Sequence, residues 1–360
     1  MASFAKPRPR SALLERLGLL AFSLVLVLGA SEFAIRIALP SSMFRDHDSD
    51  AYWILRLREA TPMERLHADE TVFDDGLGWR AKPGFAGGSV NQNSRGVRGA
   101  REHDAIAEAG TRRIVTLGDS FTWGFGVADD ETYSARLEAL LPATEVINLG
   151  VNGYGTDQQV LSWEREGVSY HPDVVVLGFF IHDFHRNGQS VFQYPKPYFV
   201  ADPTATDGFR LGGVPVVSID EIFDDEKFPV PWSSRGADAT RFVGGKLARR
   251  LGVFDPNLAY AREVEVLDYL IERLARSTRE HGAELVVVMI PARAGQAFRD
   301  APFIETTLTQ ACARHSIAVH SLTDAFADAG DALYEAAHWN AAGHAVAATS
   351  LAGSGVLAAD

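Results

Sequence analysis

The chain contains only one cysteine, Cys312, among 360 residues. A single thiol excludes an internal disulfide and any metal cluster that several thiolates would hold. Cys312 falls in an apolar-periodic segment, which favours a buried and unreactive side chain. The sequence also has no internal repeats and no low-complexity tracts. It is therefore not typical of a repeat architecture or of a disordered linker.

Basic residues are fewer than acidic residues. The chain has 34 Lys and Arg residues against 47 Asp and Glu residues, which gives a net charge of −13. An acidic surface of this size argues against nucleic acid or anionic lipid headgroups as the main partner. Hydrophobic residues make up 46% and charged residues 22%, an ordinary globular composition with enough apolar mass for a sizeable core. The length suits an anchor with one large domain, or two small domains.

Long apolar runs are absent except for Leu17–Ser31 near the N-terminus, which carries no charge. A membrane span needs about 20 apolar residues, and extension to Ile37 reaches that length. Basic residues precede the run: Lys6, Arg8, Arg10 and Arg16. Acidic residues follow it: Asp46, Asp48 and Asp50. This charge asymmetry predicts a single-pass inner-membrane anchor over residues 13–39, with its N-terminus in the cytoplasm and the rest of the chain outside.

Two alternatives to an anchor remain for residues 1–40. A charge-free stretch of this length also suits the apolar region of a cleaved signal peptide, which would release the chain outside the inner membrane. The run is also compatible with a buried helix of the folded domain. No cysteine follows it, so lipoprotein processing is excluded.

The remaining chain divides by composition into two parts. Residues 41–110 are polar and turn-rich, and we expect them to form an extension that packs on a catalytic domain over residues 111–355. Within that domain, residues 186–250 form an insert rich in proline, glycine and aromatic residues. Elsewhere, apolar strands alternate with helical patterns. The predicted strands are 114–117, 146–149, 174–180, 285–290 and 317–320, and the predicted helices are 131–141, 157–166, 260–281, 303–314 and 341–351. This alternation predicts a three-layer α/β/α domain with a mostly parallel five-stranded sheet.

Three segments carry residues suited to chemistry, and sites in such sheets form at the carboxyl ends of strands. Ser120 follows the first predicted strand, on a strand-to-helix turn where its hydroxyl can face a crevice. Asn148–Thr156 follows the second strand and is rich in glycine, which lets backbone approach a substrate. His338 follows Glu335 by three residues, a spacing that lets a carboxylate orient an imidazole.

Each segment alone also has a purely structural interpretation. Ser120 can be a turn or cap residue, the glycines can form a plain turn, and a single histidine is usually structural. Together, however, Gly118–Gly124, Asn148–Thr156 and His338–His344 resemble three sequence blocks of the SGNH/GDSL hydrolase family. The resemblance covers about residues 112–185 and 255–351, and it implies an SGNH, flavodoxin-like fold.

By this resemblance, Ser120 would be the nucleophile and His338 the base, oriented by Glu335. Backbone N–H groups of Ser120 and Gly153, together with the side chain of His182, would form the oxyanion hole. Gly76–Trp79, Asn93–Arg98 and the N-terminal apolar run are also similar to a membrane-anchored, envelope-facing bacterial branch of the family.

Two positions depart from the family pattern. His182 stands where the family has an asparagine whose amide donates to the oxyanion, and the loss of one such donor raises a reaction barrier by about 3–4 kcal/mol. An imidazole N–H can partly substitute. Glu335 stands where the family has aspartate, and Asp331 and Asp324 are alternative acids. The run from His182 to His185 is also compatible with a metal site, but no second cluster with ligand spacing accompanies it, so we expect neither metal nor cofactor.

The resemblance implies a serine esterase that forms an acyl-enzyme on O-acyl esters, acetyl esters above all, of envelope or secreted polysaccharide. An O-acyltransferase of the same fold is the close alternative, in which a sugar hydroxyl replaces water. A catalytically degenerate scaffold that serves as an envelope binding or assembly protein is the alternative from another class, and His182 favours it. The partners expected are an acylated carbohydrate or other ester substrate and the inner membrane, and no nucleic acid.

Overall fold

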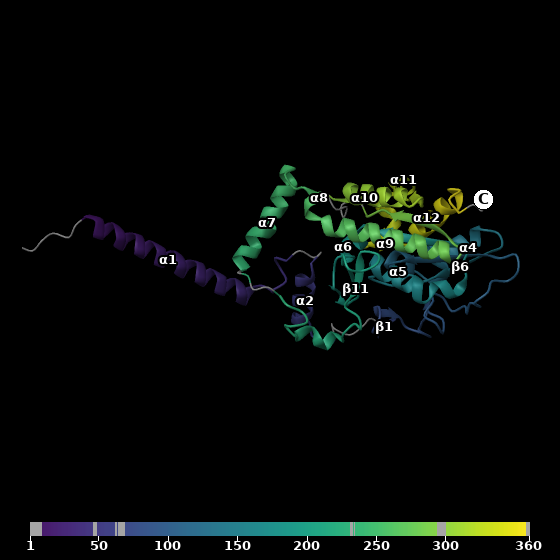
Figure 1. Cartoon of the computed structure of the whole chain (residues 1–360), viewed down its shortest axis with the longest axis horizontal. Helices are drawn as coiled ribbons and strands as arrows, with labels where there is room; N and C mark the ends of the chain where they lie inside the picture. Colours follow the sequence, from purple (N-terminus) through teal and green to yellow (C-terminus); the bar gives the residue numbers. More distant parts are fainter. Residues whose placement is uncertain are drawn as a thin grey trace, which may run out of the picture.

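The computed structural model describes residues 9–45, 49–61, 63, 69–230, 233, 235–293 and 300–357. Four charged residues behind the predicted orientation of the anchor lie outside these ranges: Lys6, Arg8, Asp46 and Asp48. Helix α1 (Pro9–Ala38) projects away from the rest of the molecule (Figure 1). Its segment Leu13–Ala38 is long and apolar enough to cross a membrane and is not buried against the protein. A signal sequence has the same properties.

Five parallel strands form the centre of the domain, in the order β13-β12-β7-β5-β6. Their bounds are Arg112–Gly118 (β5), Thr144–Asn148 (β6), Val174–Phe180 (β7), Glu284–Ile290 (β12) and Ala318–Ser321 (β13). The inner strands are runs of apolar residues buried on both faces, as expected of a parallel sheet between two helical layers. The predicted fold class is confirmed, and each predicted strand differs from the observed one by two residues or fewer at either end.

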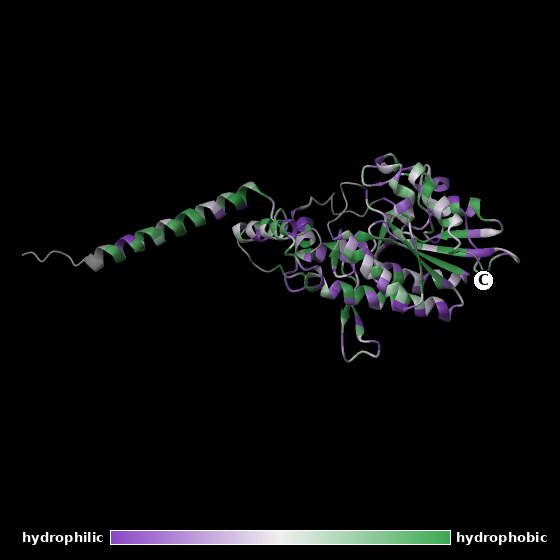
Figure 2. Ribbon diagram, turned by 90° about the horizontal axis from the view of Figure 1, so that it is seen from above, coloured by the Kyte–Doolittle hydropathy of each residue, from purple (hydrophilic) through white to green (hydrophobic). Residues whose placement is uncertain are grey.

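Helices cover both faces of this sheet, and Figure 2 shows the apolar strands between them. Alternation along β5 separates the two layers, because Val115 and Leu117 face one side and Ile114 faces the other. The first side is covered by α5 (Thr156–Arg165), α9 (Ala261–Glu280) and α10 (Ala301–Arg314). The second is covered by α4 (Tyr133–Leu140), α11 (Thr323–Ala327) and α12 (Ala341–Gly353).

The strand order reverses beside β5. After β5 the chain adds β6 on one side, and then crosses to add β7 on the other. Ligand sites in open α/β sheets form at such a switch point, outside the carboxyl ends of the strands. The residues that follow β5 and β7 therefore occupy the expected position for a site.

The segment before the sheet packs against the loop that follows β6. It contains α2 (Asp50–Glu59), β1 (Thr71–Asp74), β2 (Gly78–Ala81), β3 (Ala86–Gly87) and β4 (Val90–Asn91). The indole N–H of buried Trp79 donates to the carbonyl of Asn152 at 2.9 Å, and the hydroxyl of Tyr154 donates to the carbonyl of Trp79 at 2.6 Å. These reciprocal bonds attach the N-terminal extension to the edge of the sheet where the site is expected.

Residues 186–250 contain short hairpins and one helix. The hairpin strands are β8 (Val191–Phe192), β9 (Tyr194–Pro195), β10 (Tyr198–Ala201) and β11 (Phe209–Gly212). Helix α7 (Arg235–Leu251) follows. This helix was not predicted from the sequence; Gly236, Gly244 and Gly245 lower its intrinsic helix propensity. The other short elements are α3 (Ser120–Trp123), α6 (Ile181–Arg186), α8 (Pro256–Ala259), β14 (Tyr334–Glu335), β15 (His338–Trp339), η1 (Asp129–Glu131), η2 (Gly167–Tyr170), η3 (Ile219–Phe223) and η4 (Gly330–Leu333).

A buried ion pair ties this insert to the helical layer. The ammonium group of Lys196 is bonded to the carboxylate of Asp157 on α5, and it also donates to the carbonyls of Gln189 and Arg186 at 3.1 and 3.2 Å. Lys196 is 1% exposed and Asp157 is fully buried. Burial raises the pKa of Asp157, while the charge of Lys196 acts in the opposite direction. Each charge is therefore tolerated inside the protein only because the other is present.

We expect the substitution Lys196→Met to lower the free energy of unfolding by about 3–5 kcal/mol, because it leaves the carboxylate of Asp157 buried without its counter-charge. Denaturant unfolding at pH 7 measures the change. Lys227→Met is the matched control, because Lys227 pairs with Glu221 on the surface, where an ion pair adds little stability. Equal effects of the two substitutions would contradict the structural importance of the buried pair.

Candidate active site

The turn after β5 presents Ser120 at the first position of α3. Asp119 caps this short helix, because its carboxylate accepts the backbone N–H of Phe121 at 2.9 Å. Gly118 and Gly178 occupy paired positions at the ends of β5 and β7, and a Cβ atom on either would clash with the side chain of Thr122. The two glycines therefore let α3 lie directly on the carboxyl edge of the sheet.

Ser120 and His338 are in contact, although 218 residues separate them along the chain. Ser120 Oγ lies 2.8 Å from His338 Nε2, and the hydroxyl donates to this nitrogen when the imidazole is neutral. The ring of His338 lies between two aromatic rings, with centroid distances of 5.2 Å to Phe121 and 4.7 Å to Phe125. This geometry is that of a nucleophile beside its base.

Burial keeps His338 in its neutral form. It lowers the pKa of His338 below the usual 6.5; the negative charge of Asp119 acts in the opposite direction and the positive charge of Arg186 in the same direction. Neutral imidazole therefore predominates at pH 7, with Nε2 able to accept the proton of Ser120.

The hairpin that carries His338 is held by buried contacts from several elements. Trp339 is 1% exposed and packs against Phe121 and Phe326, with ring centroids 5.0 and 4.9 Å apart. His344, on α12, accepts the backbone N–H of Tyr133 at 3.1 Å. Burial lowers the pKa of His344 to about 3, so its ring is a neutral acceptor. This second histidine of the motif is therefore a structural residue.

Glu335 lies directly opposite His338 in the β14–β15 hairpin, so both side chains stand on the same face of this ribbon. Glu335 is exposed, and within the described ranges no hydrogen bond joins it to His338. Asp331, one of the alternative acids, instead forms a two-point ion pair with Arg293 at 3.0 and 3.1 Å. The role of Glu335 as the orienting acid stays a prediction.

The glycine-rich segment after β6 packs closely against α3. Asn148 donates from Nδ2 to the carbonyl of Thr122 at 2.7 Å, and a Cβ atom on Gly150 would clash with the backbone of Trp123. Gly153 has φ +79°, a conformation that favours glycine. The predicted oxyanion residue Gly153 therefore belongs to the segment that contacts the helix of Ser120.

His182 lies in the first turn of α6, directly after β7. Its ring stacks on that of Phe180, with centroids 4.9 Å apart and an interplanar angle of 13°. Burial lowers the pKa of His182 to about 3, and the charges of Arg186 and His185 act in the same direction. A neutral imidazole keeps one N–H for donation. Its role toward an oxyanion stays a prediction. No group of three or more His, Cys, Asp or Glu side chains within the described ranges is placed to hold a metal ion.

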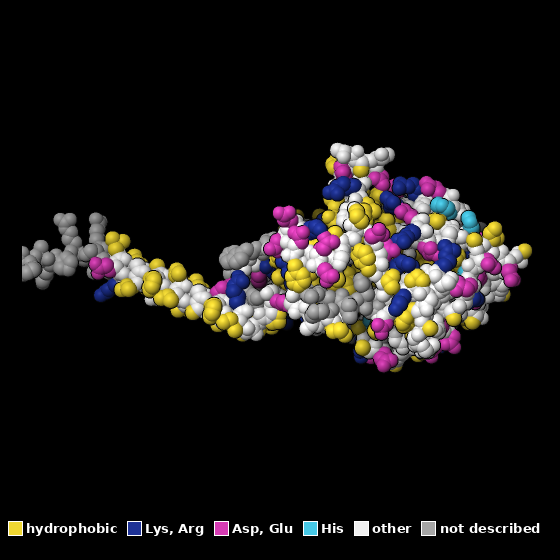
Figure 3. Space-filling view, turned by 90° about the horizontal axis from the view of Figure 1, so that it is seen from below, with side chains coloured by type: hydrophobic (Ala, Val, Ile, Leu, Met, Phe, Trp, Pro, Cys, Tyr) yellow, Lys and Arg dark blue, Asp and Glu magenta, His cyan; other side chains and the backbone are white. Residues whose placement is uncertain are grey.

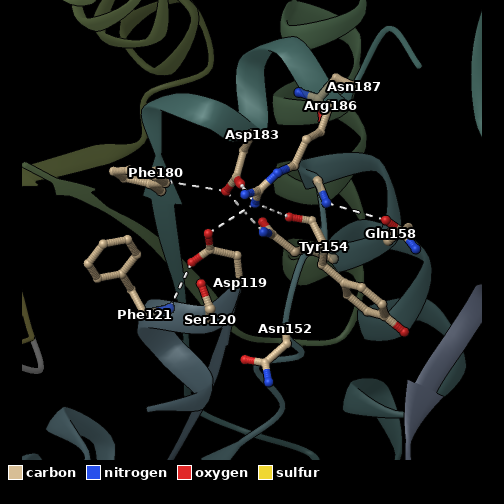
Figure 4. A network of polar contacts seen from close by, with 12 residues as sticks. Asp119, Ser120, Phe121, Asn152, Tyr154, Gln158, Phe180, Asp183, Arg186 and Asn187 are labelled. Carbon is tan, nitrogen blue, oxygen red and sulfur yellow. Dashed lines mark hydrogen bonds and ion pairs between the residues drawn. The ribbon is translucent and has the colours of Figure 1, made fainter. Parts of the chain in front are cut away.

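Sequence motifs did not reveal a buried cluster of charges beside the serine, drawn in Figure 4. Arg186 Nη1 donates to Asp119 at 3.0 Å, to Asp183 at 2.9 Å and to the carbonyl of Tyr154 at 2.9 Å. Both carboxylates are fully buried. Burial and the charge of Asp119 raise the pKa of Asp183 well above its usual value, while Arg186 acts against them. One guanidinium thus joins the segments after β5, β6 and β7.

Comparison with known proteins gives a match to one family. A model of the GDSL-like lipase/acylhydrolase family matches residues 116–346, which is more than half of the chain. No curated protein matches. Similar solved structures include a lipase/acylhydrolase from Enterococcus faecalis (14% identity, TM-score 0.39, covering 68% of this chain and 96% of that one).

Two further solved structures are similar at the same level. The esterase EstA from Pseudoalteromonas sp. has 11% identity and a TM-score of 0.38, with 67% of this chain and 94% of that one covered. The acetylxylan esterase Axe2 from Geobacillus stearothermophilus has 15% identity and a TM-score of 0.39, with 68% and 94% covered. Similarity this low says nothing about the substrate of this chain.

We expect Arg186→Met to lower the free energy of unfolding at pH 7 by about 3–5 kcal/mol, because two buried carboxylates lose their shared counter-charge. The loss should shrink as the pH falls from 7.5 to 5.5. Burial raises the pKa of Asp183, and the pKa rises further without the charge of Arg186, so the folded variant binds a proton more readily than its unfolded chain and acid favours folding. Denaturant unfolding at several pH values measures this. Arg293→Met, which removes an exposed pair, should show neither effect.

Proposed function

Because the chain belongs to the GDSL-like lipase/acylhydrolase family, we propose that it hydrolyses O-acyl esters through an acyl-enzyme on Ser120. The observation that carries the proposal is the 2.8 Å contact between Ser120 Oγ and His338 Nε2. Residues 111–355 form the catalytic domain in this proposal, residues 41–110 pack on it as an extension, and residues 186–250 are its insert.

The first half of the reaction uses the neutral imidazole of His338. Ser120 Oγ attacks the ester carbonyl carbon while its proton passes to His338 Nε2, and a tetrahedral oxyanion forms. When this intermediate collapses, the carbon–oxygen bond to the alcohol breaks and His338 returns the proton to the departing oxygen. The products of this half are an ester on Ser120 and the free alcohol.

The second half repeats these steps with water. His338 takes a proton from a water molecule, whose oxygen attacks the acyl carbon and forms a second tetrahedral oxyanion. Collapse releases the carboxylic acid and returns the proton to Ser120 Oγ. Backbone N–H groups of Ser120 and Gly153 stabilise both oxyanions, and the N–H of His182 replaces the missing asparagine amide.

Glu335 orients the imidazole in this proposal. Its position opposite His338 in the hairpin supports this role, because directly opposed side chains have Cβ atoms about 4.5–5.5 Å apart. A rotation of the exposed glutamate side chain can then bring its carboxylate to His338 Nδ1, where it would stabilise the imidazolium formed at each proton transfer.

The proposed substrates are acyl groups, acetyl above all, on envelope or secreted polysaccharide. Two features support this class. Helix α1 is apolar along the length needed to span a membrane, and an anchored catalytic domain outside the inner membrane meets such polymers. Phe125 is 47% exposed beside His338, and an exposed ring can pack on a sugar. Transfer to a sugar hydroxyl in place of water would follow the same steps.

We expect Ser120→Ala in the full-length, detergent-solubilised chain to lower turnover of p-nitrophenyl acetate and acetylated glycans by at least about 10⁴-fold, since the nucleophile is removed. Ser162→Ala is the matched control, because Ser162 on α5 has the same 8% exposure as Ser120 but lies outside the proposed machinery. Wild-type turnover by Ser120→Ala would contradict the assignment. A fluorophosphonate should label Ser120 covalently. A folded wild-type chain that is not labelled and does not turn over esters would favour the catalytically degenerate scaffold. The histidine at position 182, in place of asparagine, is the feature that supports this alternative.

The pH dependence of kcat/KM should report His338. Imidazolium cannot take the proton of Ser120, so we expect activity to rise with pH to a plateau, with its midpoint below 6.5 because burial lowers the pKa of His338. Phe125→Ser exposes the imidazole of His338 to water and should move the midpoint up toward 6.5. Phe223→Ser, which removes a ring of 51% exposure in η3, should leave it unchanged. A midpoint above 6.5 in the wild-type chain would mean that the carboxylate of Glu335 already lies at His338 in the free enzyme, where it raises the pKa of the imidazole.

A further inference from the structure

Helix α7 presents apolar side chains to solvent. Val243, Leu247 and Leu251 are 61%, 51% and 67% exposed, and their spacing of four residues places them along one face of the helix. Val253, two residues after the helix, and Leu258 of α8 are 72% and 81% exposed. Several large apolar residues, three of them on one face of α7, are therefore exposed in this part of the protein.

The opposite face of α7 is the one that meets the domain. Asp238, Phe242, Gly245 and Arg249 recur at spacings of four and three residues and line a cavity together with residues of the domain. At 3.6 residues per turn, this inward set points in nearly the opposite direction to Val243, Leu247 and Leu251. A surface helix of a soluble domain normally has its apolar stripe turned inward. In α7 the apolar stripe points outward.

The start of α7 is fastened to the end of the apolar helix α1. The backbone N–H of Gly236 donates to the carboxylate of Glu32 at 3.1 Å, and Arg36 donates to the carbonyl of Ser233 at 3.0 Å. Glu32 and Arg36 lie near the end of the segment long enough to span a membrane. In Figure 1, α7 runs across the direction of α1. A helix that begins at this level and runs in this direction lies along the surface of a membrane that α1 crosses.

Positive charges border the apolar face. By helical geometry, Arg250 lies beside the stripe, next to Val243, whereas Arg241 and Lys246 lie at the two sides of the helix and also line the cavity. All three are exposed. The chain as a whole carries a charge of −13, yet α7 has five Lys or Arg residues and one Asp. The overall acidity argued against anionic headgroups as the main partner, and α7 is a local exception to it.

We propose that α7 is an interfacial helix that lies on the bilayer from which α1 emerges. Val243, Leu247 and Leu251 would enter the boundary between headgroups and acyl chains to a depth of about 5–10 Å. Arg250, beside the stripe, would meet lipid phosphates. The proposal rests on α1 as a membrane span, which is part of the proposed function, but not on the esterase activity. Figure 3 shows how fully the apolar side chains of α1 are exposed.

Docking of α7 also orients the catalytic edge of the sheet. His185 of α6 lines the same cavity as the inward face of α7, and α6 follows directly from the carboxyl end of β7. Ser120 belongs to that edge of the sheet. A docked α7 therefore holds the edge that carries Ser120 on the membrane side of the domain, at a fixed orientation that a single flexible anchor would not provide.

The test places an environment-sensitive fluorophore on the stripe of the full-length chain in vesicles of phosphatidylethanolamine and phosphatidylglycerol. Leu247→Cys is labelled with a nitrobenzoxadiazole group, and the native Cys312 is fully buried. Ile106→Cys is the matched control, because Ile106 is an exposed apolar residue (77%) outside α7. We expect a blue-shifted emission at position 247, and quenching by nitroxide-labelled lipid at least about threefold stronger than at position 106.

Two results would overturn the proposal. Quenching at position 247 that does not exceed that at position 106 would mean that α7 stays in water. A blue shift without lipid quenching, growing with the number of chains per vesicle, would mean that a second copy of the chain covers the face. Flotation of the vesicles reports insertion of α1 separately, so a failure of the anchor is distinguished from a failure of α7 to dock.

Discussion

The guanidinium of Arg186 is the contact on which the arrangement of the site depends. It reaches the residue before the serine, the acid after β7 and a carbonyl of the segment after β6. These three segments follow different strands, and nothing in their own sequences fixes their relative positions. Two buried carboxylates would repel each other at this edge of the sheet if the guanidinium were absent. One cation therefore offsets part of the repulsion between the two carboxyl groups and also sets the geometry of the cluster.

A second set of contacts brings the base to the serine. His338 arrives on a two-stranded hairpin that belongs to none of the central strands, and Trp339 anchors this hairpin between Phe121 and Phe326. Because Phe121 is the neighbour of Ser120, the same aromatic packing that holds the hairpin also holds the α3 turn. The serine and the histidine are thus positioned by one apolar cluster on a face of the sheet and one charged cluster beside the serine.

The molecule also has two apolar surfaces that its own fold does not cover. Helix α1 and the outward stripe of α7 are both exposed, and the contacts from Glu32 and Arg36 join them. In water such surfaces are costly, whereas a bilayer covers both at once. The reversed arrangement of α7 is then explained. Its polar face lines the cavity against the domain, and its apolar face meets lipid.

The sequence by itself determined the alternation of the five central strands with the main helices that cover them, the apolar N-terminal helix, and the motif positions of Ser120 and His338. These features depend on residues that are close in the sequence, namely on apolar periodicity, the placement of glycines and short motifs. The tertiary structure alone decided that Arg186 links three loops, that Glu335 stands exposed opposite His338, and that α7 turns its apolar stripe outward. The physical reason is that each depends on which distant segments meet. A guanidinium contributes strongly to stability when the carboxylates that it contacts are buried. Only the folded chain shows which residues are buried.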